Sequence, residues 1–220
     1  MTLKPLSSQR RRTVQANYDR LSRWYDWLAG PGERALRSKG LKKLQVIAGE
    51  TVLEIGFGTG QTLLALAQSV GEDGKVVGVD LSPKMVAVAR ERLQSAGLAA
   101  RVHLVCSDAA QIAWENDSFD AIFFCFSLEV LDPLDMQRLL ANCRQALRSA
   151  GRICVVAMAS ERQGGAMARL YRWAHHKVPS WVDCRPIFTQ ALLAQAGFQV
   201  FETTSESLWG LPVSLVLARK

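Results

Sequence analysis

A glycine-rich turn between two short apolar segments constrains the fold of this chain more than any other feature. Three glycines alternate with other residues across 56–60. They directly follow a short stretch (52–55) in which Val52, Leu53 and Ile55 suit a strand buried on both faces of a parallel sheet. An apolar helical segment (61–70) and a second strand (76–79) follow, and Asp80 closes that strand. This order predicts a βαβ unit that holds a nucleotide at the carboxyl ends of its strands.

The spacing of the glycines indicates which class of nucleotide ligand the loop can bind. Dinucleotide sites carry G-x-G-x-x-G, whereas this chain has Gly56, Gly58 and Gly60, and Gln61 stands where the third glycine would be. A pyrophosphate needs a close backbone approach at that position, so NAD fits poorly. Asp80 lies twenty residues beyond Gly60, where its carboxylate can accept hydrogen bonds from both hydroxyls of a ribose.

The pattern E-x-G-x-G-x-G, which begins at Glu54, and the acid at the end of the second strand resemble the class I S-adenosylmethionine (SAM) methyltransferases. The resemblance implies that SAM is the cofactor and S-adenosylhomocysteine the product. It places Glu54 and the glycine loop (56–60) beside the methionine part of SAM, and Asp80 at the ribose. It extends over nearly the whole chain and is firm across residues 50–155.

Two further segments are expected at the adenine. Leu81 and Met85 follow the acid of the second strand and are placed to touch the adenine face, although Met85 suits the core equally well. The resemblance implies that Asp108, after a third expected strand (101–106), accepts a hydrogen bond from the adenine amino group, with Ala109 alongside. The alternative for Asp108 is a surface-loop residue that contacts no ligand.

The N-terminal segment resembles the ubiquinone/menaquinone-biosynthesis type of these enzymes. Tyr18-Asp19 and Tyr25-Asp26 match the Tyr-Asp elements near the start of that type, so Tyr18 is expected to close over SAM and Tyr25 to border the acceptor. The alternative is that both rings pack in a helix seam. The chain lacks that type's Ser/His/Trp continuation after Asp26 and its Arg-Asn at the end of the fourth strand. The acceptor therefore stays open between a quinol, a lipid amine and another small molecule.

The end of the fourth strand and an aromatic insertion (159–187) are expected to border the methyl group and the acceptor. The residues assigned there are Phe126 on the cofactor side and Ser127, Leu128, Tyr171 and Trp173 on the substrate side. The D/N-P-P-Y/F tetrapeptide of DNA and RNA amino-methyltransferases does not occur at this strand end. A small, partly apolar acceptor in a pocket is therefore favoured over nucleic acid.

Methyl transfer from a sulfonium mainly requires positioning and a dry site, so neither a catalytic triad nor a metal is predicted. A general base remains a hypothesis. The candidates are His175 and His176 in the aromatic insertion, and Glu129 after the fourth strand. The alternative for the two histidines is a solvated helix face.

The sequence predicts one α/β domain (1–220) with helices on both faces of a sheet, and the resemblance implies that it is a methyltransferase domain. The resemblance implies a Rossmann-like seven-stranded sheet in the order 3-2-1-4-5-7-6. Within it we expect an N-terminal helical arm (1–48), a SAM-binding core (49–158), a cap or substrate insertion (159–187) and a closing helix and hairpin (188–220).

The basic charge lies in the N-terminal arm. Residues 1–50 contain 11 Lys and Arg against 4 Asp and Glu, whereas residues 51–220 contain 16 of each kind. Such an arm could contact an anionic membrane surface, a nucleic acid or an acidic substrate, or form a solvated helix face. No apolar run approaches the roughly 20 residues of a membrane span, and no signal core follows the N-terminal charges. We therefore expect a cytoplasmic protein, with peripheral membrane contact left open.

The five cysteines, at positions 106, 125, 143, 154 and 184, show no C-x-x-C spacing and are expected to be reduced core residues. Two other functions remain open. A SAM-binding protein without turnover would keep the same pocket, because methyl transfer requires no particular catalytic side chain. An NAD(P)-dependent oxidoreductase would share the sheet, but the glycine spacing and Asp108 speak against it.

Overall fold

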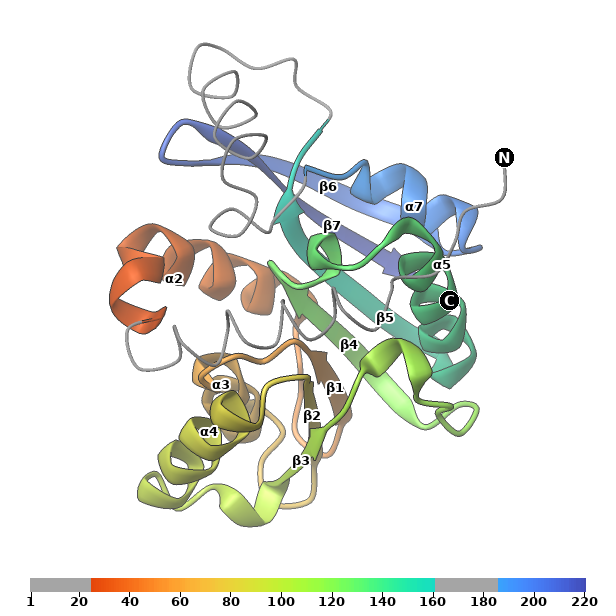
Figure 1. Ribbon diagram of the computed structural model, residues 1–220. Helices are drawn as coiled ribbons and strands as arrows, with labels where there is room; N and C mark the ends of the chain where they lie inside the picture. Colours follow the sequence, from red (N-terminus) through yellow and green to blue (C-terminus); the bar gives the residue numbers. More distant parts are fainter. Residues whose placement is uncertain (1–24, 161–185) are drawn as a thin grey trace.

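The computed structural model describes residues 25–160 and 186–220, which form one mixed sheet with helices on both faces (Figure 1). The sheet order is β3-β2-β1-β4-β5-β7-β6, which confirms the predicted order. Strands β1 to β5 pair in parallel, and β7 runs antiparallel to both of its neighbours. The strands are β1 (Thr51–Ile55), β2 (Lys75–Asp80), β3 (Val102–Cys106), β4 (Phe119–Cys125), β5 (Leu147–Met158), β6 (Gln199–Leu208) and β7 (Leu211–Arg219).

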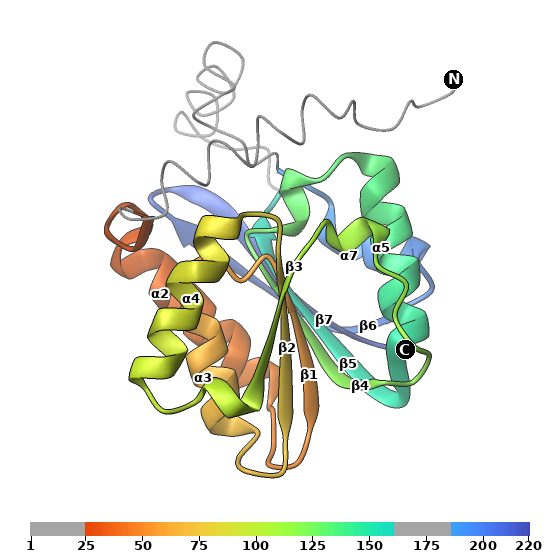
Figure 2. The ribbon, with the colours of Figure 1, turned by 60° about the horizontal axis from the view of Figure 1, so that its bottom comes forward.

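Among the described helices, three lie on one face of the sheet and two on the other (Figure 2). Adjacent residues of β4 show this division, because Phe123 packs in the core on the α2–α4 side and Phe124 in the core on the α5–α7 side. Alternation of this kind is what a strand between two helical layers requires. The helices are α2 (Tyr25–Leu44), α3 (Gln61–Ser69), α4 (Pro83–Ser95), α5 (Pro133–Ala146) and α7 (Thr189–Gln195), with 3₁₀ turns η1 (Ala99–Arg101), η2 (Ala109–Gln111) and η3 (Leu128–Val130).

Helix α2 is kinked at Gly30. Gly30 has φ 67° and ψ 179°, outside the helical region, and Pro31 follows it at the start of the second segment. That segment packs tightly on the sheet at Gly40, where a Cβ atom would lie 2.7 Å from Val156 Cγ2 and 3.1 Å from Phe123 Cε2. The arm is therefore joined to the core and does not extend away from it at this point.

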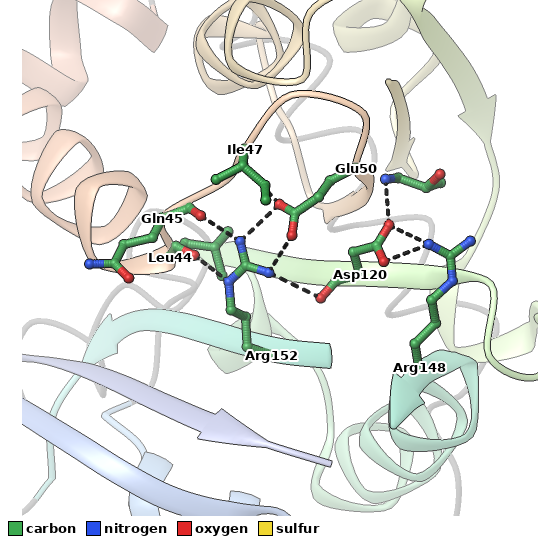
Figure 3. A network of polar contacts seen from close by, with 8 residues as sticks. Leu44, Gln45, Ile47, Glu50, Asp120, Arg148 and Arg152 are labelled. Carbon is green, nitrogen blue, oxygen red and sulfur yellow. Dashed lines mark hydrogen bonds and ion pairs between the residues drawn. The ribbon is translucent and has the colours of Figure 1, made fainter. Parts of the chain in front are cut away.

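A polar network joins the C-terminal end of α2 to the amino ends of the central strands (Figure 3). Arg152 donates to the carbonyl oxygens of Leu44 and Gln45 at 2.5 and 2.6 Å, and to the two Glu50 carboxylate oxygens at 2.7 and 2.8 Å. Beside it, Asp120 accepts from the Thr51 amide at 2.8 Å and from Arg148. Asp120 thus has a structural role near the start of β4.

Part of the basic charge of the arm is paired within the fold. Lys39 binds Glu206 at 2.7 Å, and Lys43 also forms an ion pair with Glu202, so α2 is linked to the edge strand β6. None of the helices in the described part of the chain is long and apolar enough to cross a membrane.

The cysteine expectation is correct for some positions and wrong for one. Cys143 and Cys154 are buried and free, and Cys125 is free and half-buried. Cys106, expected in the core, is exposed because it ends β3, the edge strand that pairs on one side only. Cys184 lies outside the described residues.

Candidate cofactor and acceptor site

A pocket lies at the carboxyl ends of β1, β2, β3 and β4, which is where ligands bind in open parallel sheets. The loops after these four strands form most of its lining, and α2 and the first turn of α5 complete it. Within residues 25–160 and 186–220, no three His, Cys, Asp or Glu side chains come together as metal ligands would.

The three glycines of the loop after β1 play different parts. All three have positive φ, 74° at Gly56, 55° at Gly58 and 80° at Gly60. A Cβ at Gly56 would lie 2.3 Å from the Cβ of Ser127, so this glycine lets the loop after β4 approach. Gly60 packs instead against Ala89 of α4 and does not line the pocket, whereas Gly56 and Gly58 do.

Asp80 is held in place by the backbone. Its Oδ2 accepts from the Gly58 amide at 2.8 Å, and its Oδ1 accepts from the Ser82 amide at 2.9 Å. Each carboxylate oxygen can accept more than one hydrogen bond, so this geometry orients the group for the two hydroxyls of a ribose. The bond to Gly58 also ties the end of β2 to the glycine loop.

Glu54 is a buried carboxyl group in the central strand β1, and it faces the pocket. Its residue is 1% exposed, and its Oε2 has no hydrogen-bond partner. Burial raises the pKa of Glu54 to about 8, the charge of Asp80 acts in the same direction, and a hydrogen bond to Thr62 and the charge of Arg37 oppose the shift. A bound cation such as an ammonium group would favour the ionised form and satisfy this oxygen.

The residues predicted at the adenine are gathered at one end of the pocket. Leu81, Met85, Asp108 and Ala109 all line it, and Met85 is also almost fully buried, so both roles foreseen for it are compatible. Asp108 caps η2, with Oδ1 accepting from the Ala110 amide at 3.1 Å. These contacts orient its carboxylate at the pocket.

The end of β4 divides the residues predicted there. Phe126 adopts φ 52° and donates its amide to the Val156 carbonyl at 2.8 Å, while Ser127 Oγ donates to the Ile55 carbonyl at 2.6 Å. Both line the pocket, as does Cys125. Leu128 is fully buried in η3 and does not line the pocket.

Glu129 is also buried away from the pocket lining. Its Oε1 accepts from the Met158 amide at 3.1 Å, whereas its Oε2 has no partner. Burial raises its pKa to about 7, and the charge of Glu33 adds to this shift, while hydrogen bonds to backbone amides oppose it. A direct contact with an acceptor would require this side chain to leave its present position.

Several predicted positions lie beyond the described part of the structure. Tyr18, Tyr171, Trp173, His175 and His176 are outside the described residues, and Tyr25 begins α2 but its side chain is not described. Their assigned roles stay predictions.

Sequence reasoning missed two pocket residues on α2, Glu33 and Arg37. They form an ion pair at 3.0 Å, each side chain being 13% exposed. The available signal was their i,i+4 spacing on a helix, but the same spacing is common on solvated helices, and only the docking of α2 shows that this pair faces inward.

The fold and this pocket define a Rossmann-like methyltransferase domain, and comparisons with known proteins agree. Residues 52–151 match a family model described as a methyltransferase domain. A ubiquinone/menaquinone biosynthesis C-methyltransferase of Paraburkholderia phytofirmans is 30% identical over 79% of this chain and 68% of its own length. An O-methyltransferase of Penicillium expansum is 32% identical over 79% of this chain and 60% of its own length.

Solved structures share the fold at lower identity. A SAM-dependent methyltransferase from Aquifex aeolicus has a TM-score of 0.68 at 22% identity and covers 90% of this chain and 98% of its own. The [4+2]-cyclase SpnF has a TM-score of 0.77 at 19% identity, with 100% and 98% covered, so the fold by itself does not establish methyl transfer.

The chain belongs to the class I SAM-dependent methyltransferases. It spans 50–60% of the length of the first four curated relatives that it matches.

Proposed function

We propose that the protein binds SAM and transfers its methyl group to a small, partly apolar acceptor, releasing S-adenosylhomocysteine. The observation that carries this proposal is the pocket itself, in which the Asp80 carboxylate is held by the amides of Gly58 and Ser82 at the carboxyl ends of β1 and β2. Buried Glu54 lies in the same pocket, suited to a cationic group. A pocket rich in carboxyl groups also complements a sulfonium.

The chemistry requires little of the side chains. The acceptor atom attacks the methyl carbon in line, and its new bond forms as the sulfonium–methyl bond breaks. The sulfur keeps the electron pair, and the methylated acceptor releases its proton to solvent. The apolar residues Phe126, Val130 and Leu131 border the pocket and are placed to exclude water and hold an apolar acceptor. A phenol or quinol, a lipid amine and a small amine remain the classes of acceptor to compare. The curated relatives include both an O-methyltransferase and C-methyltransferases.

Calorimetric titration of SAM, S-adenosylhomocysteine and NAD tests the cofactor. We expect SAM and its product to bind and NAD not to bind. Asp80→Ala should weaken the binding of SAM by tenfold or more, since hydrogen bonds to a carboxylate contribute about 1.5–3 kcal/mol to the free energy of binding. Asp73→Ala, at an exposed position beyond α3, is the matched control and should bind as the wild type does. If the wild type fails to bind SAM, the proposal is wrong; binding without turnover on any acceptor would favour a non-catalytic SAM-binding protein.

A cytoplasmic location is part of the proposal and is supported by the free thiols of Cys143 and Cys154. Peripheral contact of the basic arm with anionic membranes is also proposed, although the pairs made by Lys39 and Lys43 reduce the charge available on α2. Sedimentation with anionic and neutral vesicles at low and high salt tests this contact. Binding that is selective for anionic vesicles and lost at high salt is expected, and equal binding to both would contradict it.

A further inference from the structure

The turn between β6 and β7 carries a residue that its backbone does not favour. Trp209 and Gly210 connect the paired residues Leu208 and Leu211, and their φ angles are 51° and 80°. Two-residue turns with positive φ at both positions favour Asn-Gly or Asp-Gly, because a bulky side chain is strained at the first position. Trp209 is also 62% exposed, so packing offsets little of this strain. An outlier of this kind indicates that the side chain serves a function.

The turn lies at the same edge of the sheet as the pocket. Strand β7 is antiparallel to β5, so Val213 near its start pairs with Met158 at the carboxyl end of β5. Leu211 precedes Val213 and pairs with Leu208 of β6, so the hairpin extends beyond this point. The carboxyl ends of β1 to β4, where the pocket lies, face the same way because these strands are parallel to β5.

Positive charge enters the fold beside this turn. The kink of α2 lies against the tryptophan, since a Cβ atom at Gly30 would be 3.6 Å from Trp209 Cζ2. Residues 1–24 contain six Lys and Arg, one Asp and no Glu, and they join the described structure at Tyr25, five residues before the kink. Arg34, four residues after the kink, is exposed. The basic part of the chain is therefore attached next to the exposed ring.

The acidic residues of α2 and β6 near the turn do not cancel this charge. Glu33 binds Arg37 at 3.0 Å, and Glu206 binds Lys39 at 2.7 Å, so each pair is neutral as a whole. A tryptophan ring prefers the boundary between lipid headgroups and acyl chains, and Lys and Arg are attracted to anionic lipids. The turn and its surroundings thus combine the two attractions by which peripheral proteins bind a bilayer.

We propose that Trp209 anchors the protein to an anionic membrane surface, with its ring at the headgroup boundary and the charge of Arg34 and residues 1–24 attracted to the lipid phosphates. This rests on the proposed membrane contact of the basic arm and goes beyond it, because it assigns the side chain that enters the bilayer. The edge of the sheet that bears the pocket then faces the membrane, which suits an apolar acceptor that is dissolved there.

Sedimentation of the full chain with vesicles of mixed phosphatidylcholine and phosphatidylglycerol tests this anchor, with vesicles of phosphatidylcholine alone as the neutral comparison. Trp209→Asn should weaken binding to the mixed vesicles by about tenfold or more, because burial of a large side chain contributes at least this factor. Since Asn-Gly suits the turn, this variant should unfold at the same temperature as the wild type or higher. Ile47→Ala, at a 64% exposed position before the amino end of β1, is the matched control and should bind as the wild type does.

Two further variants separate the ring from the charge. Trp209→Phe keeps an aromatic anchor and should retain most of the affinity, but it should reduce the quenching of tryptophan fluorescence by brominated phosphatidylcholine in the mixed vesicles. Arg34→Gln should weaken binding to the mixed vesicles by about fivefold, because each cation near an anionic surface contributes about this factor. It should leave the weak binding to neutral vesicles unchanged.

The outcomes distinguish this inference from the membrane contact on which it rests. If the wild type binds neither kind of vesicle, or both equally, the contact of the arm fails and the anchor with it. If the wild type prefers mixed vesicles and Trp209→Asn keeps its affinity, the contact of the arm stands and the inference about Trp209 is overturned. With vesicle binding unchanged, weaker SAM binding by calorimetry would place the turn over the pocket, and a changed mass by light scattering would place it against a second copy. Either result also overturns the inference.

Discussion

Replacing Arg152 with Met should weaken the joint that fixes α2 to the sheet (Figure 3). The Arg152 side chain is 18% exposed and donates to the carbonyls of Leu44 and Gln45 and to both carboxylate oxygens of Glu50, all at 2.5–2.8 Å. Methionine keeps an apolar side chain but removes every donor. Two carbonyls at the end of a helix would lose this partner, and the Glu50 carboxylate, which is 13% exposed, would keep only the Ile47 amide that donates to its Oε2 at 3.0 Å.

The expected loss follows from these contacts. A hydrogen bond to a charged group contributes about 1.5–3 kcal/mol, and removing one member of a buried ion pair costs about 3–5 kcal/mol. Solvent can partly replace Arg152 because Glu50 is not fully buried, so we expect a loss of about 3 kcal/mol in the free energy of unfolding. For a domain of this size that corresponds to a decrease in Tm of about 6–12 °C.

Urea denaturation measures the effect, with Arg148→Met as the matched control. Arg148 binds Asp120 at 2.5 Å in the same network, but its side chain is 48% exposed, so its loss should cost about 1 kcal/mol or less. A double-mutant cycle with Glu50→Gln should give a coupling of about 1 kcal/mol or more. The reasoning is refuted if the Arg152 and Arg148 variants lose equal stability, or if the Arg152 and Glu50 changes are additive.

Two further predictions concern the pocket. Gly56→Ala should lower the free energy of unfolding, measured by urea denaturation, by about 2–4 kcal/mol, because it combines positive φ with a clash against Ser127. Gly58→Ala, which has positive φ but open space around the added Cβ, should lower it by about 1–2 kcal/mol. Equal losses in the two variants would contradict the clash. Burial raises the pKa of Glu54 from 4.5 to about 8, so the folded, ligand-free protein keeps a proton that the unfolded chain releases, and the contribution of this group to stability should fall as pH rises through that window. Urea denaturation at pH 5, 6.5 and 8 should show a flatter pH profile for Glu54→Gln than for the wild type, while Glu91→Gln at an exposed position should follow the wild type; an unchanged slope in Glu54→Gln would count against the burial argument.

The sequence was sufficient where local chemistry and strand order decide the structure. The glycine loop and Asp80 could be placed because positive φ and a strand-ending acid are local signals, and parallel strands bring their carboxyl ends together. The cap of α4 was predictable for the same reason, since Ser82 accepts from the Met85 amide with Pro83 in the first turn.

Tertiary packing decided the residues that the sequence misplaced. Leu128 and Glu129 follow the fourth strand directly, but η3 turns both into the core, so closeness in sequence did not bring them to the pocket lining. Cys106 looked like a core residue in an apolar strand, and only the edge position of β3 exposes it.

The parts of helix α2 have different roles, which its sequence pattern does not distinguish. Arg152 fixes its C-terminal end to the sheet, Gly40 allows close packing in its second half, and Arg37 faces the pocket about one turn earlier. The pocket is lined in part by α2, and Arg152 contributes to the docking of this helix on the sheet. Arg152→Met should therefore also weaken binding of SAM, although Arg152 pairs with Ala121 near the start of β4 and the pocket lies at the carboxyl ends of the strands. Unchanged affinity in the folded variant would contradict this reasoning.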